Sequence, residues 1–202
     1  MKYLHLALTL TLLLATTAWA QEKATTESGK KILVFPDGTW KPDTEKPAPA
    51  GPTSVPAGST TKLAFNHGKS ALFYNPKKWK VEKEEEAGRT SLEHTEGDGY
   101  AILISERVEI PLEGLKKIAL SNAKEAAPDA EIIFEDKRKV NGKDILVLKL
   151  KGTISELPFF YYGYYYSGKE GTIQALTYTA QNLFDEFKPD FEELLNGLVV
   201  NP

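Results

Sequence analysis

The stretch from Ile132 to Leu150, which reads IIFEDKRKVNGKDILVLKL, decides the fold class. Two runs of strand-forming character, Ile132–Val140 and Asp144–Leu150, flank the pair Asn141-Gly142. These two residues tolerate the two positive φ angles of a type I′ turn, which joins neighbouring antiparallel strands. We therefore predict a β-hairpin at this point and an antiparallel sheet around it.

Similar runs lie on both sides of this hairpin and are also separated by turn residues. Alternating apolar and polar residues of this kind are typical of half-buried strands. Before the hairpin we predict strands at Ala71–Tyr74, Trp79–Lys83, Thr90–His94 and Tyr100–Glu106, and after it at Phe159–Tyr166 and Thr172–Thr179.

Two helices complete the predicted order of four strands, a helix, four strands and a helix. Pro111 fits the first helical position, and the helix must end near Ala127 because the residue before a proline disfavours helical geometry. The last helix is predicted to start at Pro189, with Leu183–Phe187 as a separate turn, and to end at Gly197 as its C-cap. The pattern predicts an α+β fold in which helices flank a mostly antiparallel sheet.

The N-terminus predicts export. Met1–Ala20 has a basic start, an apolar run and a small-x-small ending at Ala18 and Ala20, which is typical of a signal peptide cut before Gln21. A permanent signal anchor is the alternative, but the apolar run is shorter than the roughly 20 residues that span a bilayer. We expect a periplasmic or secreted protein that does not span the membrane after cleavage.

The mature chain divides into three parts by composition. Residues 21–41 are predicted to hold a small β-hairpin with its turn at Pro36-Asp37-Gly38-Thr39. Residues 42–60 carry five prolines and no periodic apolar pattern, which is typical of a stiff linker. Residues 61–202 have the composition and the length of one compact domain.

Several motifs of this domain resemble the PsbP-like family, which includes extrinsic photosystem II proteins and bacterial envelope relatives of the DcrB type. The resemblance covers roughly Leu72–Val200 and rests on Phe73-Tyr74-Asn75-Pro76-x-x-Trp79, Val140-Asn141-Gly142-Lys143 and Phe187-x-x-x-Phe191-x-x-Leu194-Leu195. It implies a sandwich around an antiparallel sheet and a non-enzymatic role, often in stabilising a larger assembly. The segment Asp37-Gly38-Thr39-Trp40 also resembles a short hairpin found at the ends of various exported proteins.

Composition argues against several functional classes. The chain has no cysteine, which removes thiolate metal sites and cysteine nucleophiles. The net charge is −3, and becomes −4 when Lys2 leaves with the signal peptide, so nucleic acid is not an expected partner. The mature chain has only His67 and His94, both predicted as solvated loop residues, so neither a metal site nor a cofactor is expected.

The segment from Phe159 to Tyr166 reads FFYYGYYY and holds five of the nine tyrosines. If Tyr166 pairs with Thr172, then Tyr162, Tyr164, Tyr166 and Gln174 share one face of the sheet. A ligand-binding platform would use the phenolic hydroxyls of this face, and these four residues are the candidate ligand-binding site. Packing of both faces under helices, with the hydroxyls at the rim, is the alternative.

No set of residues forms a catalytic constellation, so no catalytic residues are assigned. We expect an exported, non-catalytic accessory or binding module of the cell envelope, whose partner is an envelope protein or assembly. A ligand-binding domain that uses the tyrosine face for a glycan, lipid or peptide is the alternative. An enzyme with a site assembled from scattered polar residues is a third hypothesis.

Overall fold

The computed structural model describes residues 22–26, 31–35, 38–42, 54–82 and 88–201. The chain forms two compact units, Met1–Ala48 and Pro49–Pro202, which are described separately. The predicted signal peptide and most of the predicted linker lie outside the described residues. The boundaries at residues 20, 41 and 60 therefore stay predictions.

The N-terminal unit is a small antiparallel sheet in the order β1-β2-β3. Its strands are β1 (Glu22–Thr25), β2 (Lys31–Val34) and β3 (Trp40–Pro42), of which β1 was not predicted. The Phe35 N–H donates to the Thr39 carbonyl over 2.9 Å, which closes the connection between β2 and β3. The side chain of Trp40 is 63% exposed.

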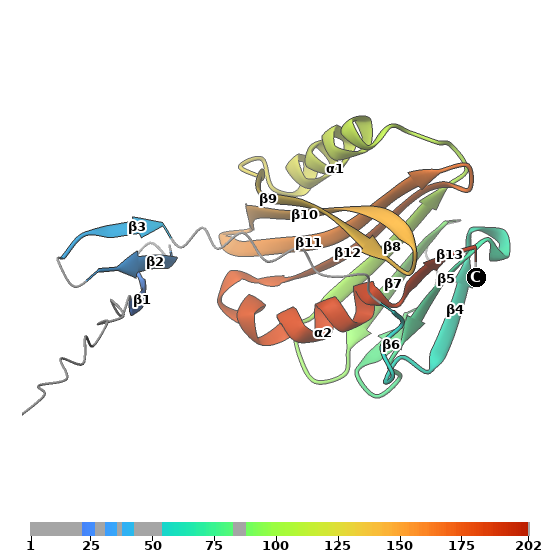
Figure 1. Cartoon of the computed structure of the whole chain (residues 1–202), viewed down its shortest axis with the longest axis horizontal. Coiled ribbons are helices and arrows are strands. Elements are labelled where there is room, and N and C mark those ends of the chain that lie inside the picture. The colour runs from blue at the N-terminus through green and yellow to red at the C-terminus, as the bar shows by residue number, and fades with distance from the viewer. Residues whose placement is uncertain (1–21, 27–30, 36–37, 43–53, 83–87, 202) are drawn as a thin grey trace, which may run out of the picture. The chain divides into compact units, whose positions relative to one another are not determined.

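The larger unit contains a seven-stranded and a three-stranded sheet, both antiparallel, with two helices, so the predicted α+β class is confirmed. The large sheet has the order β6-β7-β8-β12-β11-β10-β9, and the small sheet has the order β13-β5-β4 (Figure 1). The large-sheet strands are β6 (Trp79–Val81), β7 (Arg89–His94), β8 (Tyr100–Glu106), β9 (Glu131–Val140), β10 (Lys143–Ile154), β11 (Leu157–Gly168) and β12 (Gly171–Ala180). The small-sheet strands are β4 (Thr61–Phe65), β5 (Ser70–Tyr74) and β13 (Leu198–Val200). The sequence pattern predicted neither β4 nor β13.

The hairpin that decided the fold class has the predicted geometry. Val140 pairs with Lys143, so the turn between β9 and β10 contains only Asn141 and Gly142. Their φ angles are 47° and 82°, the two positive values that a type I′ turn requires. The Asn141 side chain also donates to the carbonyls of Asn196 and Leu198, which links the turn to the C-terminal segment.

Each face of the large sheet is covered by a different set of elements. Helix α1 (Leu112–Ala126) packs on one face, where Leu115 and Ala119 contact Leu146 and Leu148 of β10. Helix α2 (Phe184–Asn196) and the small sheet cover the other face and build the larger core. Figure 1 shows the two helices on opposite sides of the strands β10, β11 and β12.

Two predicted helix starts were wrong. Pro111 is the residue before α1 and has an extended backbone, rather than being its first helical residue. Pro189 lies inside α2, which begins at Phe184 after a short 3-10 turn, η2 (Gln181–Leu183). Phe184 and Phe187 are buried against the sheet, and this apolar burial outweighs the one backbone hydrogen bond that a proline removes from the helix.

Candidate functional site

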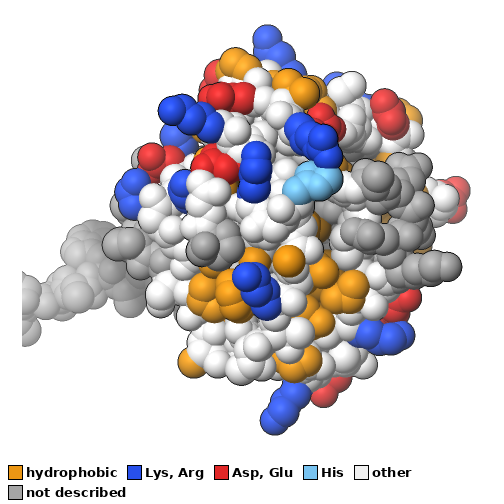
Figure 2. All heavy atoms as spheres, turned by 90° about the vertical axis from the view of Figure 1, so that its right-hand side faces the viewer, with side chains coloured by type: hydrophobic (Ala, Val, Ile, Leu, Met, Phe, Trp, Pro, Cys, Tyr) orange, Lys and Arg blue, Asp and Glu red, His pale blue; other side chains and the backbone are white. Residues whose placement is uncertain are grey.

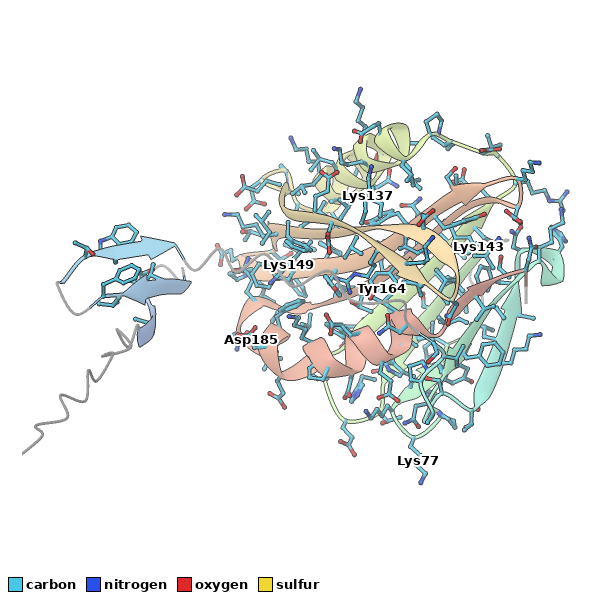
Figure 3. All side chains as sticks on the ribbon, viewed as in Figure 1. Lys77, Lys137, Lys143, Lys149, Tyr164 and Asp185 are labelled. Atoms are coloured by element: carbon cyan, nitrogen blue, oxygen red, sulfur yellow. The ribbon has the colours of Figure 1, made fainter. Side chains whose placement is uncertain are left out.

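The tyrosine-rich part of strand β11 is largely buried inside the larger unit. Tyr162, Tyr164 and Tyr166 face α2 and the small sheet, and their exposed fractions are 3%, 0% and 7%. Figure 3 shows Tyr164 between the β10 strand and α2. The three side chains therefore form part of the larger core, and a ligand role for them stays a prediction.

The predicted register of β11 against β12 was wrong by one residue. Tyr166 pairs with Ile173, because Lys169 and Glu170 alone form the turn between the two strands. A shift of one residue moves a side chain to the opposite face of a sheet. Gln174 consequently pairs with Tyr165, is 4% exposed, and does not share a face with Tyr164.

Each of the three tyrosine hydroxyls has a protein partner. Tyr162 donates to Glu192 over 3.3 Å, and Tyr164 donates to the Asn196 side chain over 3.0 Å while it accepts from Arg138 over 3.0 Å. Burial raises the pKa of both phenols. Because buried hydroxyls need partners, this network explains how a core strand accommodates so many phenols.

His94 is buried, so its prediction as a solvated loop residue was wrong. The ring lies edge-on between Trp79 and Phe187, with both centroid distances at 5.1 Å. Its Nδ1 accepts the Glu96 N–H over 3.2 Å, which leaves Nε2–H to donate to Asp190 over 3.1 Å. Both ring nitrogens are engaged within the fold, so we assign His94 a structural role. Across the described ranges, no group of three or more His, Asp or Glu side chains is placed to hold a metal ion.

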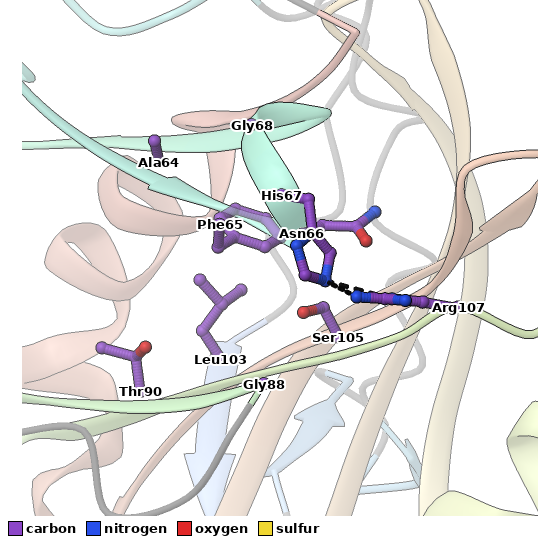
Figure 4. A pocket seen from close by; sticks show the side chains of 10 residues that line it. All are labelled: Ala64, Phe65, Asn66, His67, Gly68, Gly88, Thr90, Leu103, Ser105 and Arg107. Carbon is purple, nitrogen blue, oxygen red and sulfur yellow. Dashed lines mark hydrogen bonds between the residues drawn. The ribbon is translucent and has the colours of Figure 1, made fainter.

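A cavity of about 460 Å³ opens between the small sheet and the strands β7 and β8 of the large sheet. Figure 4 shows it beneath η1 (Asn66–Gly68), the short turn between β4 and β5. Small residues at several lining positions leave this space unfilled. The described residues that line it are Ala64, Phe65, Asn66, His67, Gly68, Gly88, Thr90, Leu103, Ser105 and Arg107.

The turn η1 has an uncommon backbone. Asn66, His67 and Gly68 have φ angles of 51°, 54° and 79°, so two consecutive non-glycine residues adopt the left-handed conformation. Such residues cost of order 1 kcal/mol each and persist only where the surrounding structure holds them. The Asn66 side chain donates to the Glu170 carbonyl over 2.8 Å and provides this support. Strained backbone of this kind clusters at binding sites, which makes the turn a candidate.

His67 and Arg107 form the polar side of the cavity. The Nε–H of Arg107 donates to His67 Nε2 over 3.0 Å, and one of its terminal N–H groups donates to the same atom (Figure 4). Because an arginine stays protonated, His67 Nε2 must be the acceptor, and the ring is a neutral imidazole with its proton on Nδ1. In the part of the chain that the structure describes, the Arg107 guanidinium has no carboxylate partner.

Glu170 ties the wall of the cavity to the rest of the fold. Its carboxylate accepts the Tyr166 hydroxyl over 2.6 Å and the Asn201 side-chain amide, while its carbonyl holds Asn66. The Tyr166 hydrogen bond lowers the pKa of Glu170, and burial together with Glu170 raises the pKa of Tyr166 to about 12. The turn between β11 and β12, the η1 turn and the C-terminal end are thereby held together, which favours a preformed cavity.

Sequence reasoning did not find this site. His67 was predicted as a solvated loop residue and is indeed exposed, but Arg107 was not singled out. The one available signal was Asn66-His67-Gly68, a turn that places a histidine between residues that tolerate positive φ. Figure 2 views the side of the small sheet and shows an exposed histidine among Lys and Arg side chains.

Comparison with known proteins supports the fold. The chain resembles the cyanobacterial PsbP (CyanoP) of Synechocystis at 14% identity and a TM-score of 0.53, over 76% of this chain and 99% of that one. A protein of Bacteroides thetaiotaomicron aligns at 9% identity and a TM-score of 0.51, over 71% of this chain and 49% of that one. LpqN, involved in cell envelope biogenesis of Mycobacterium tuberculosis, aligns at 10% identity and a TM-score of 0.43, over 70% of this chain and 90% of that one.

The likeness to CyanoP shows a PsbP-like fold and nothing finer. No protein-family model matches the chain, and no curated protein matches its sequence. Neither helix of the described part is long and apolar enough to cross a membrane.

Proposed function

We propose that this chain is an exported, non-catalytic binding module of the cell envelope, and that it holds a small molecule in the cavity beside Arg107. The cavity carries the proposal. Its volume of about 460 Å³ lies within the range of small-molecule sites, and its mixture of apolar side chains with a few placed polar groups is typical of them.

The envelope location of the proposal comes from the sequence of Met1–Ala20, and the PsbP-like fold of CyanoP is compatible with it. An accessory role in a DcrB-type envelope assembly is part of the same proposal, since a module of this kind acts through what it binds. The buried tyrosines favour the cavity over the β11 strand as the place of binding.

Native mass spectrometry of the protein, purified from its own envelope, tests this proposal. We expect a chain that starts at Gln21 and carries a retained small molecule. Replacing Ser105, which lines the cavity, with Phe should fill part of the space and remove that molecule. Glu106→Phe is the matched control, because it adds the same side chain at an exposed position on the next residue of the same strand.

Three outcomes would contradict the proposal. A cytoplasmic chain that retains Met1 would argue against export. Equal retention of the molecule by Ser105→Phe and wild type, or capture of a protein partner with no molecule in the cavity of either form, would argue against the cavity as the binding site.

A further inference from the structure

We infer that the cavity selects an organic carboxylate with an apolar body, whose carboxylate group binds Arg107. This inference rests on the proposed function, because it names the class of molecule that the same cavity takes. Three features of the cavity carry it: the balance of charge in its lining, the geometry of the guanidinium, and the apolar side chains beside it.

The described residues of the lining are rich in hydrogen-bond donors. These 10 residues include one guanidinium and no Asp or Glu side chain. Arg107 uses two N–H groups on His67, and the other N–H groups of its side chain have no protein acceptor within the described ranges. The neutral His67 also presents an Nδ1–H, and Ser105 presents a hydroxyl. A group that only accepts hydrogen bonds and carries negative charge satisfies this set of donors.

The geometry of the guanidinium favours a carboxylate among such groups. The planar fork of an arginine matches the two oxygens of a carboxylate in a bidentate pair, which is stronger than a neutral hydrogen bond. His67 acts as a positioning residue. It accepts from one edge of the Arg107 fork, and it is itself fixed by the left-handed turn that Asn66 anchors on Glu170.

The rest of the cavity fits an apolar body. Phe65 and Leu103 line it beside the polar groups (Figure 4), and Phe65 is half-buried. A bare inorganic anion would leave the Phe65 ring in contact with water, whereas a hydrocarbon chain or ring would cover it. The same apolar lining argues against a polyanion such as nucleic acid, which agrees with the net negative charge of the chain.

Isothermal titration of the mature protein with matched probes tests the inference. Phenylbutyrate and phenylbutyramide have the same apolar hydrocarbon part. They differ only at the end group, which is a charged carboxylate in the first and a neutral amide in the second. We expect phenylbutyrate to bind at least about tenfold more tightly than the amide, the ratio that one charge-assisted pair provides. Acetate and inorganic phosphate lack the large apolar part, so both should bind more weakly than phenylbutyrate.

Substitutions test whether the preference for the carboxylate depends on the side chain of Arg107. Arg107→Gln should reduce the affinity for phenylbutyrate to that of the amide and leave the affinity for the amide unchanged. Lys62→Gln is the charge-matched control, because Lys62 is exposed on β4 and does not line the cavity. It should leave both affinities as in the wild type. His67→Gln, which keeps a carbonyl acceptor for Arg107, should retain more affinity for phenylbutyrate than His67→Phe.

Equal affinities for phenylbutyrate and phenylbutyramide, or an Arg107→Gln protein that binds phenylbutyrate as the wild type does, would overturn the inference. The proposed function fails in a different way. If neither probe binds while the protein retains an uncharged molecule that Ser105→Phe releases, the carboxylate inference is wrong and the binding function stands. If Ser105→Phe releases nothing, the proposed function itself is contradicted.

Discussion

Replacing Tyr164 and Tyr166 together by Ser should abolish the cooperative thermal unfolding transition of this protein. Both side chains belong to the larger core, with exposed fractions of 0% and 7%. Truncation of a buried aromatic residue costs about 3–5 kcal/mol, so the pair should cost about 6–10 kcal/mol. That loss is comparable to the whole net stability of a typical domain, about 5–15 kcal/mol. Loss of the transition is followed by circular dichroism on heating.

The single variants and a control on the same strand make this prediction specific. Leu157→Ser removes a side chain of β11 that is 58% exposed, and should leave the transition nearly unchanged. Tyr164→Phe keeps the ring but leaves Arg138 and Asn196 without their hydroxyl partner, so an intermediate loss is expected. A double Ser variant that unfolds cooperatively near the wild-type temperature and no longer binds a ligand would instead assign binding to the tyrosine face.

Replacing Gly171 by Ala should destabilise the protein by about 3 kcal/mol or more. Gly171 has a φ angle of 108°, which side chains rarely adopt, and an added Cβ would lie 2.0 Å from the Glu106 carbonyl oxygen of the neighbouring strand. Neither the β12 nor the β8 backbone can move without breaking the ladder between them. The added atom would also lie 3.1 Å from the Cα of Arg107, so the cavity wall should shift with it.

Gly142→Ala provides the matched comparison for Gly171→Ala. Gly142 also has a positive φ angle, 82°, but an added Cβ there would meet no atom within 4 Å. Strain alone should cost about 1 kcal/mol at this position. Denaturant titration of both variants separates the cost of the positive φ angle from the cost of the steric clash with Glu106. Equal unfolding midpoints for the two variants would mean that the contact between the added Cβ and the Glu106 carbonyl does not destabilise the protein.

The long strands and their succession along the chain could be predicted from the sequence because they depend on local signals. The Asn141-Gly142 turn has one favoured geometry, and the runs on either side of it are long enough to show their character. The strands β4 and β13 were not predicted, and they form because they pair with β5, which is a tertiary effect. Pro189 was misjudged because the burial of Phe184 and Phe187, a tertiary effect, extends α2 past a helix-breaking residue.

The candidate site was harder to predict than the fold, for two physical reasons. The turn from Ser167 to Gly171 allows more than one loop length, and a shift of one residue in the register placed Gln174 on the face opposite to Tyr164. The cavity brings together residues from β4, η1, β7, β8 and the loop after β8, which are far apart in the sequence. Nothing local to Arg107 indicates that His67 lies beside it.

Amide chemical-shift mapping of the nitrogen-labelled mature protein tests the central claim most directly. The protein would be titrated with the small-molecule extract of its own envelope. We predict that the largest shifts occur at Phe65–Gly68, Gly88–Thr90 and Leu103–Arg107, the segments that surround the cavity. Shifts concentrated at Tyr162–Tyr166, with the amides around the cavity unchanged, would contradict it.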